Sequence, residues 1–379
     1  MANGANSGNH KIRVLIIVDS ALICRILKEV INSYPDMEAV GAASNSLQAF
    51  DMIRALNPDV LTLDDGMPEM DGQTFLEKLM SLHPKPVIMI SALTERGFEA
   101  ALRALELGVM DFLAKPKLGM VDGMQDYADE IAEKIRIVSK EKVKSRTSNT
   151  SVLLSPPITA GRIISTEKLI LVGSSTGGTE ALKEFLVPMP SDAPAILVAQ
   201  HMPEAFTKSF AARLDGLCRM TVTEGEHNER VLSGHVYIAP GHSHMLVKRS
   251  GSNYMIELNQ SAPVNHHRPS VEVLFRSAAQ CVAANAIGVM LTGMGKDGAV
   301  GMLEMRRAGA YNFAQDEATC VVYGMPRAAV EIGAAHESKP IQEMAQSVLA
   351  RLMKMSQETG CNNQGNIRNI AEIPQGSKI

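Results

Sequence analysis

The sequence predicts two α/β domains, each built around a doubly wound parallel sheet, with a polar linker between them. Three observations lead to this fold class. The chain has 379 residues, and one domain commonly takes about 100–200. Short apolar runs alternate with helical patterns in two separate blocks, which is typical of β-α-β units. A stretch rich in Ser, Thr, Asn and Pro separates the blocks.

The first block covers residues 11–130, and we expect its five apolar runs to be strands. The runs are RVLIIV at 13–18, MEAVGAA at 37–43, VLTL at 60–63, PVIMIS at 86–91 and MDFLA at 110–114. A charged helix is expected from Met124 to Lys144, followed by the polar sequence SRTSNTS. Residues 131–165 are therefore predicted to contain the end of that helix and the interdomain linker.

The second block covers residues 166–356 and has the same alternation. Its clearest apolar runs are LILV at 169–172, AILVAQ at 195–200, VYIAP at 236–240 and AIGVMLTG at 286–293. Residues 357–379 are polar, with Gly, Asn and Gln, so we predict a disordered tail there.

Composition argues against several classes of protein. The net charge of −4 provides no basic footprint for nucleic acid or a membrane surface. No apolar run approaches the roughly 18 residues of a membrane span, and the N-terminal MANGANSGNH lacks the apolar centre of a signal peptide. The five cysteines are scattered without a C-x-x-C pair, so we expect no disulfides, no cysteine zinc site and a cytoplasmic location.

Four polar residues follow strands of the first block, namely Asp19, Asp64, Ser91 and Lys115. The carboxyl ends of parallel strands gather at one edge of the sheet, so we expect these side chains to converge. Two carboxylates can hold Mg²⁺, while the lysine and the hydroxyl can bind a phosphoryl group. Each residue alone could be an ordinary loop residue, but four successive matches favour a site for phosphorylating an aspartate.

Residues 11–117 resemble a response-regulator receiver domain, which has a flavodoxin-like doubly wound fold. The resemblance implies that Asp64 is the phosphorylation site and receives its phosphoryl group from a histidine kinase. It also implies that Ser91 and Lys115 are the switch residues that respond to phosphorylation.

The expected metal site departs from the receiver pattern. The resemblance implies that Mg²⁺ binds Asp19, Asp64 and the backbone carbonyl of Gly66, but Val18 stands where a second acid is usual. Neighbouring side chains on a strand point to opposite faces, so we expect that Asp65 does not replace the missing acid. We therefore expect weak Mg²⁺ binding and slow phosphorylation.

The run VGSSTGGTEAL at 172–182 predicts a strand, a tight turn and a helix start. A phosphate-binding P-loop needs a lysine after its last glycine, but Thr179 and Glu180 follow Gly178. The spacing G-x-S-x-G at 173–177 instead fits a nucleophile elbow with Ser175 at its centre. The N–H groups at the following helix start would face a developing negative charge.

A serine nucleophile needs a base, and two further strand-end residues complete a candidate triad. His201 follows the run AILVAQ, and Asp297 lies in MGKDGAVG after AIGVMLTG. Triad logic assigns attack to Ser175, proton transfer to His201 and orientation of the imidazole to Asp297. The order Ser-His-Asp differs from that of α/β-hydrolases, but geometry rather than order defines a triad. The alternatives are that His201 caps a strand and that Asp297 is a turn acid.

Other histidines raise the possibility of a zinc site. They occur in GHSH, with His242 and His244, and in NHHRP, with His266 and His267. Zinc needs three or four ligands at suitable spacing, and H-E-x-x-H is absent. We expect a solvated loop near the cleft, with His267 and Arg268 lining the substrate groove.

The second block closely resembles the catalytic domain of chemotaxis-specific protein-glutamate methylesterases, from about residue 168 to 355. The matching segments are GSSTGGTEAL, QHMPEAFTKSFAARL, VYIAPG, PVNHHRPSVEVLF, GVMLTGMGKDGAVGM and CVVYGMPRAA. The resemblance implies that Ser175, His201 and Asp297 are the catalytic residues. The rule that the residue after the nucleophile helps bind the oxyanion points to the backbone N–H of Thr176, and the resemblance suggests Met294 as the second donor.

Both resemblances imply a phosphorylation-regulated hydrolase of chemotaxis adaptation. Its substrates would be glutamate γ-methyl esters, and specific glutamines, of methyl-accepting chemoreceptors, and its phosphodonor a chemotaxis histidine kinase. Hydrolysis itself would need no cofactor. One alternative is a non-enzymatic regulator with a degenerate receiver. A DNA-binding response regulator is disfavoured because it needs a basic recognition helix.

Overall fold

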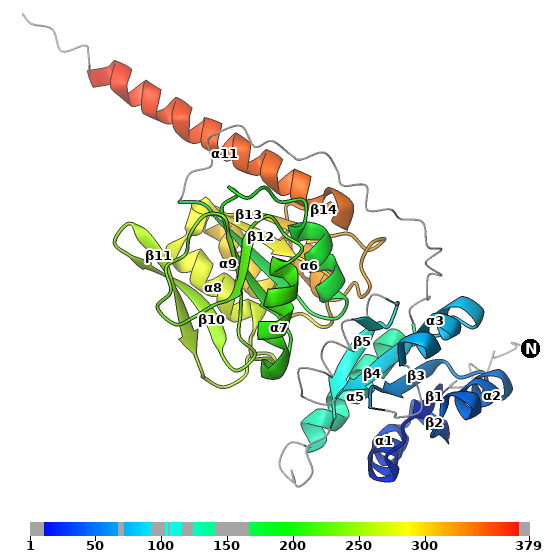
Figure 1. Cartoon of the computed structure of the whole chain (residues 1–379). Coiled ribbons are helices and arrows are strands. Elements are labelled where there is room, and N and C mark those ends of the chain that lie inside the picture. The colour runs from blue at the N-terminus through cyan, green and yellow to red at the C-terminus, as the bar shows by residue number, and fades with distance from the viewer. Residues whose placement is uncertain are drawn as a thin grey trace, which may run out of the picture. The chain divides into compact units, whose positions relative to one another are not determined.

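The computed structural model of the protein describes residues 11–66, 72–91, 103–104, 107–115, 124–140 and 167–370 (Figure 1). The chain forms two compact units, an N-terminal one and a C-terminal one. Each unit is an α/β structure with its own parallel sheet, as the alternating sequence pattern predicts.

The N-terminal unit has a five-stranded parallel sheet in the order β2-β1-β3-β4-β5. This is the flavodoxin-like order, so the predicted fold class is confirmed. The strands are β1 (Ile12–Ile17), β2 (Met37–Ala43), β3 (Val60–Asp64), β4 (Val87–Ser91) and β5 (Asp111–Ala114). The helices are α1 (Ala21–Ser33), α2 (Ser46–Leu56), α3 (Gly72–Leu82) and α5 (Met124–Val138).

Helix α1 shows how the sequence specifies these elements. Its first turn is capped by Ser20, whose hydroxyl accepts the N–H of Ile23 at 3.4 Å. It then buries Leu27, Val30 and Ile31, a spacing of three and four residues that forms one helix face. These side chains pack with those of strand β1, so the strand end that precedes Asp19 is anchored from one side.

Helix α5 belongs to the N-terminal core, which corrects the predicted boundary at residue 130. Ile131, Ala132, Ile135 and Val138 are buried in the same apolar cluster as the strands. A fully buried Ile or Val side chain contributes roughly 1.5–3 kcal/mol, so this face holds the helix on the sheet. The helix ends at Val138 rather than at Lys144, and residues 141–166 lie outside the described part of the chain.

The C-terminal unit has a seven-stranded parallel sheet in the order β14-β13-β12-β6-β7-β9-β8. A hairpin of β10 and β11, which the sequence pattern did not predict, stands beside this sheet. The strands are β6 (Leu169–Ser174), β7 (Ala195–Gln200), β8 (Thr221–Glu224), β9 (His235–Ile238), β10 (His244–Ser250), β11 (Asn253–Asn259), β12 (Ala286–Met290), β13 (Tyr311–Gln315) and β14 (Glu337–Lys339). The helices are α6 (Gly178–Leu186), α7 (Glu204–Asp215), α8 (Val271–Cys281), η1 (Ala283–Asn285), α9 (Ala299–Arg307), α10 (Met325–Glu331) and α11 (Ile341–Ile370).

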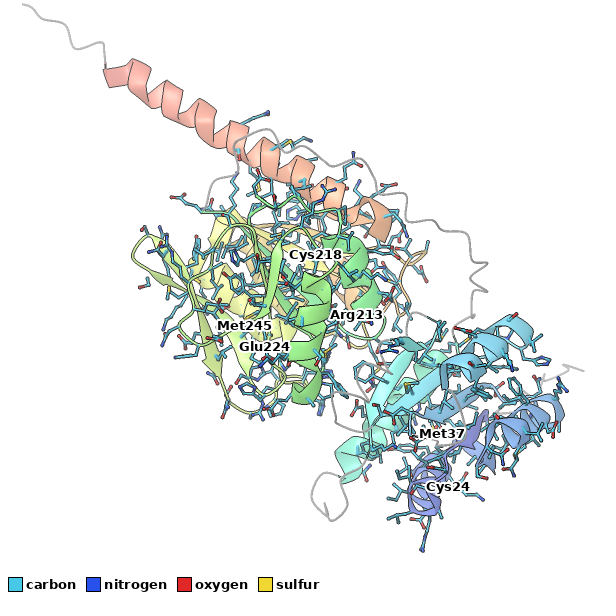
Figure 2. All side chains as sticks on the ribbon, viewed as in Figure 1. Cys24, Met37, Arg213, Cys218, Glu224 and Met245 are labelled. Atoms are coloured by element: carbon cyan, nitrogen blue, oxygen red, sulfur yellow. The ribbon has the colours of Figure 1, made fainter. Side chains whose placement is uncertain are left out.

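Helices cover both faces of this sheet, which makes the fold doubly wound. One face packs against α8, α9, α10 and the hairpin in a single apolar cluster. Helices α6 and α11 contact each other and lie on the sheet through β6 and β13. Figure 2 labels one buried methionine from each unit, Met37 in the N-terminal core and Met245 in the C-terminal core.

Helix α11 continues to Ile370, so the predicted disordered tail from residue 357 is wrong over residues 357–370. The helix is anchored by Val348, Leu349 and Leu352, which are buried. Met355, Gln357 and Glu358 are good helix formers, and each of the two later glycines, Gly360 and Gly365, costs only about 1 kcal/mol in a helix. The overall polarity of the segment concealed this propensity.

Candidate active site and phosphoacceptor site

Ser175 lies in the tight turn between β6 and α6, as the nucleophile-elbow spacing predicts. Its N–H donates to the carbonyl of Thr292 at 3.0 Å, and its carbonyl accepts the N–H of Gly178 at 2.8 Å. Gly177 has a φ of 75°, a conformation that favours glycine. At Gly178 a Cβ atom would lie 2.2 Å from Oε1 of Gln200, so the chain also needs glycine there for close packing. The turn therefore holds the serine at a fixed position beyond the strand.

His201 directly follows β7, the neighbour of β6 in the sheet. Its N–H donates to the carbonyl of Ser174 at 3.1 Å, which continues the pairing of the two strands. The imidazole Nδ1 lies 3.1 Å from Oγ of Ser175, and Nε2 lies 2.9 Å from Oδ2 of Asp297. A carboxylate can only accept, so Nε2 carries the proton and Nδ1 accepts the serine hydroxyl.

Asp297 lies in the loop between β12 and α9 and is 2% exposed. Its carboxylate accepts four hydrogen bonds: Oδ1 from Nδ2 of Asn265 and Oγ of Ser270 (both 2.8 Å), Oδ2 from Nε2 of His201 (2.9 Å) and N–H of Val271 (2.7 Å). Burial alone would raise the pKa of this acid, but the hydrogen bonds from His201, Asn265 and Ser270 outweigh it and lower the pKa to about 2. Asp297 is therefore ionised at neutral pH.

The three residues thus form one hydrogen-bonded chain from the turns and loops that follow three different strands. The alternatives of a strand cap for His201 and a turn acid for Asp297 do not account for contacts between residues 26 and 96 positions apart in sequence. Ser175 is joined through His201 to a buried carboxylate, which is the arrangement needed to activate a hydroxyl.

The two expected oxyanion donors, the N–H groups of Thr176 and Met294, belong to segments next to this serine. Thr176 follows it in the turn and is buried. Gly293, which precedes Met294, approaches Ser175 so closely that a Cβ at residue 293 would lie 2.9 Å from Cβ of the serine. The backbone of Thr176 and that of Gly293, the residue before Met294, are therefore adjacent to the nucleophile.

Gln200 is a supporting residue that the sequence reasoning did not single out. Its Nε2 donates to the carbonyls of Ser175 at 2.9 Å and His201 at 3.1 Å, and its Oε1 accepts the hydroxyl of Ser174 at 2.6 Å. One buried amide therefore fixes the backbone of both the nucleophile and the base. Asn265 and Ser270, the donors to Asp297, were also missed.

The segment NHHRP lies beside the imidazole of His201. The ring of His267 stacks on that of His201, with centroids 3.6 Å apart and an angle of 17° between the planes. His267 therefore lies against the imidazole of the candidate base. Arg268 donates instead to the carbonyls of Gln260 and Ser261, both at 3.1 Å.

His244 is buried, so the expectation of a solvated loop is wrong at this position. It begins β10 and has no solvent exposure. Its Nδ1 accepts the N–H of Ser270 and its Nε2 faces the carbonyl of Ala262, both at 3.1 Å. Burial lowers the pKa of His244 below its ordinary value, which agrees with a neutral ring that accepts at one nitrogen and donates at the other.

Among the described residues, no group of three or more His, Cys, Asp or Glu side chains is arranged to hold a metal ion. None of the helices in the same part of the chain combines the length and the apolar character that a membrane span needs.

In the N-terminal unit, Asp64 ends β3 and its side chain is buried next to Lys115. Oδ1 of Asp64 accepts the N–H of Gly66 at 2.8 Å and lies 2.6 Å from Nζ of Lys115. Oδ2 is buried and has no hydrogen-bond partner among the residues that the structure describes. Burial alone would lower the pKa of Lys115, but the hydrogen bond to Asp64 and the charge of Asp65 raise it above its ordinary value.

Asp65 joins the same cluster, which corrects the expectation that it points to the opposite face. Its Oδ2 accepts the hydroxyl of Ser91 at 2.5 Å, and its Oδ1 lies 3.4 Å from Nζ of Lys115. The strand ends at Asp64, so the alternation of strand side chains no longer applies one residue later. Asp19 is exposed, whereas Val18 is buried in the apolar core.

Comparison with known proteins identifies relatives of both units. The model of the response regulator receiver domain matches residues 14–120, and that of the CheB methylesterase matches residues 170–348. Protein-glutamate methylesterase/protein-glutamine glutaminase 2 of Cupriavidus pinatubonensis is 59% identical over 342 residues, which cover 90% of this chain and 96% of the relative. The enzyme of the same name from Nitrosomonas europaea is 58% identical over 349 residues, covering 90% and 97%.

A solved structure similar to the C-terminal unit is the crystal structure of the Thermotoga maritima CheB methylesterase catalytic domain. It is 40% identical in sequence and covers 48% of this chain and 97% of its own, with a TM-score of 0.48.

Proposed function

This chain belongs to the family of protein-glutamate methylesterases/protein-glutamine glutaminases with an N-terminal receiver domain, and we propose that it demethylates chemoreceptors under the control of phosphorylation. The observation that carries the proposal is the hydrogen-bonded chain from the Ser175 hydroxyl through His201 to Asp297. The substrate class is the γ-methyl ester of receptor glutamate residues.

The first half of the reaction is acylation of Ser175. Its Oγ attacks the ester carbonyl carbon while its proton passes to Nδ1 of His201, 3.1 Å away. The backbone N–H groups of Thr176 and Met294 are the proposed donors to the oxyanion. The bond to the methoxy group then breaks, the methoxy oxygen takes the proton from Nδ1, and methanol leaves.

The second half restores the serine and the receptor carboxylate. Water gives a proton to Nδ1 of His201 and attacks the acyl carbon. The bond to Oγ of Ser175 breaks and this oxygen takes the proton back, which leaves a glutamate side chain. With a glutamine substrate the first leaving group is ammonia, and the remaining steps are the same.

Asp297 acts through His201 in both halves. Its four hydrogen bonds fix the carboxylate at the N-terminus of α8, a position that also stabilises negative charge. The fixed carboxylate holds the proton on Nε2 and stabilises the imidazolium that forms during each proton transfer.

The proposed control step is phosphorylation of Asp64 by a chemotaxis histidine kinase. A carboxylate oxygen of Asp64 would bond to phosphorus as the phosphorus–nitrogen bond of the donor phosphohistidine breaks. Lys115 and Ser91 lie in the same cluster and are the proposed partners of the phosphoryl oxygens.

The carboxylates of Asp64 and Asp19 suit a Mg²⁺ ion, which receiver domains use for this phosphoryl transfer. The buried Oδ2 atom of Asp64 lacks a hydrogen-bond partner, and a cation would satisfy it. Asp19 and the carbonyl of Gly66 are the further proposed ligands. A bound Mg²⁺ would neutralise charge on the transferring group.

The proposal implies a cytoplasmic protein, because the receptor helices that carry these esters and the kinase lie there. The alternative of a non-enzymatic regulator has no support among the named relatives. It also gives no role to the hydrogen-bonded chain of Ser175, His201 and Asp297.

The direct test uses the full chain and receptor membranes that carry isotope-labelled methyl esters. We expect labelled methanol to appear, and to appear faster when acetyl phosphate and Mg²⁺ are present. Asp64→Asn should retain the slow release without the acceleration. Absence of methanol under all conditions would contradict the hydrolase assignment, and an equal acceleration in Asp64→Asn would contradict control through Asp64.

A further inference from the structure

The carboxylate of Asp65 holds the two side chains that a phosphoryl group on Asp64 would need. Oδ2 accepts the Ser91 hydroxyl at 2.5 Å, and Oδ1 lies 3.4 Å from Nζ of Lys115. Lys115 also lies 2.6 Å from Oδ1 of Asp64, so its ammonium group is shared between two acids.

These contacts are shielded from water. The side chain of Asp65 is 5% exposed, and Ser91 is fully buried. A hydroxyl has one proton to donate, so Ser91 cannot serve Asp65 and a phosphoryl oxygen with the same proton. A hydrogen bond to an ionised acceptor in such a place is stronger than a neutral one.

Asp65 directly follows Asp64, the proposed phosphoacceptor, and adds a second carboxylate at the end of β3. Val18, by contrast, supplies no carboxylate at the end of β1. The Asp65 carboxylate lies on the side of the cluster where Ser91 and Lys115 lie.

We propose that Asp65 is a positioning residue that competes with the phosphoryl group for Ser91 and Lys115 and thereby opposes phosphorylation of this receiver. The proposal rests on the proposed role of Asp64 as phosphoacceptor. Phosphorylation requires the Ser91–Asp65 bond to break and places a second negative group beside the Asp65 carboxylate. The unphosphorylated state is favoured by both effects.

The structure favours this role over that of a substitute Mg²⁺ ligand. Both oxygens of Asp65 are already engaged, by Ser91 and by Lys115. Within this cluster, the buried oxygen that has no hydrogen-bond partner among the described residues is instead Oδ2 of Asp64. A ligand role for Asp65 would therefore require these contacts to be given up.

The test measures binding of beryllofluoride, a phosphoryl analogue, to the full chain at saturating Mg²⁺. Because the sequence contains no Trp whose fluorescence could report binding, the readout is ¹⁹F NMR of the bound beryllofluoride. We expect Asp65→Asn and Asp65→Ala to bind it about tenfold more tightly than the wild type, the scale of one charge-assisted hydrogen bond. Asp51→Asn, which removes an exposed carboxylate of α2, should bind like the wild type.

A double-mutant cycle tests the competition for Ser91 itself. In the Ser91→Ala background the gain from Asp65→Asn should shrink, because no hydroxyl remains to be released. An equal gain in both backgrounds would overturn competition for Ser91. Thermal unfolding of each full-length variant verifies that the receiver is folded.

The outcomes separate this proposal from the function on which it rests. If the wild type binds beryllofluoride and the Asp65 variants bind no more tightly, only the competitor role is overturned. If Asp65→Asn binds Mg²⁺ tenfold more weakly than the wild type, Asp65 is a metal ligand and the proposal is wrong. If neither the wild type nor any Asp65 variant binds, phosphoryl acceptance fails and the competitor role fails with it.

Discussion

Nδ1 of His201 lies 3.1 Å from Oγ of Ser175, although the two residues are 26 positions apart in sequence. The contact follows from the pairing of β6 and β7, which are parallel neighbours and end at Ser174 and Gln200. Each residue directly follows its strand, so the sheet itself sets their separation. The serine is therefore positioned by the paired ends of the two strands.

Replacing Asp297 by Asn should reduce turnover by roughly 10⁴, the loss seen when a triad acid becomes an amide. The amide cannot stabilise an imidazolium, and its NH₂ group would face N–H or O–H donors from Val271, Asn265 or Ser270. We expect kcat to fall with little change in KM for methylated receptor. An effect below about tenfold would show that His201 does not depend on this acid.

His244 should make the stability of the C-terminal unit depend on pH. Its pKa is lowered in the folded state, so below about 6.5 the unfolded chain binds the proton more readily than the folded one. The free energy of unfolding should therefore fall as the pH drops from 7 to 5.

The variant His244→Gln should show a smaller fall in that free energy, measured by urea unfolding at several pH values. His336 also has a lowered pKa and remains in both proteins, so it provides a common background. If the two profiles have the same slope, His244 does not titrate differently in the folded and unfolded states.

Val18→Asp should tighten Mg²⁺ binding by roughly 10–100-fold, the usual value of an outer-shell partner of a metal. The same change should destabilise the receiver, because Val18 is 4% exposed within the apolar core. Calorimetric titration of Mg²⁺ and thermal unfolding measure the two effects. Val18→Asn is the matched control, since it has the shape of Asp without the charge and should give little gain in affinity. Equal Mg²⁺ affinity in Val18→Asp and the wild type would show that the missing acid is unimportant.

The parts of the site that lie at strand ends could be predicted from the sequence. Ser175, His201 and Asp297 each follow an apolar run, and the geometry of a parallel sheet brings such positions to one edge. The same reasoning located Asp64, Ser91 and Lys115. Strand ends are predictable because an apolar run and its last residue can be read directly from the chain.

The supporting contacts could not be predicted in this way. Asn265 reaches Asp297 from a loop in which its own φ is 52°, a backbone conformation that no periodic pattern indicates. His244 is polar, yet its two ring nitrogens are both satisfied inside the fold, so it can be buried. The contacts of Asp65 were not predicted, because this residue lies one position beyond the end of β3, where the alternation of strand side chains no longer applies.

The most direct test of the account is methanol release from methylated receptor by Ser175→Ala and by its neighbour Ser174→Ala. The Ser174 hydroxyl is buried and donates to Gln200, so its loss should cost about 1–3 kcal/mol of stability while most activity remains. Ser175→Ala should keep the fold, verified by circular dichroism, and lose on the order of 10⁴–10⁶ in rate. Near wild-type methanol release by Ser175→Ala would contradict the account, because another residue would then have to be the nucleophile.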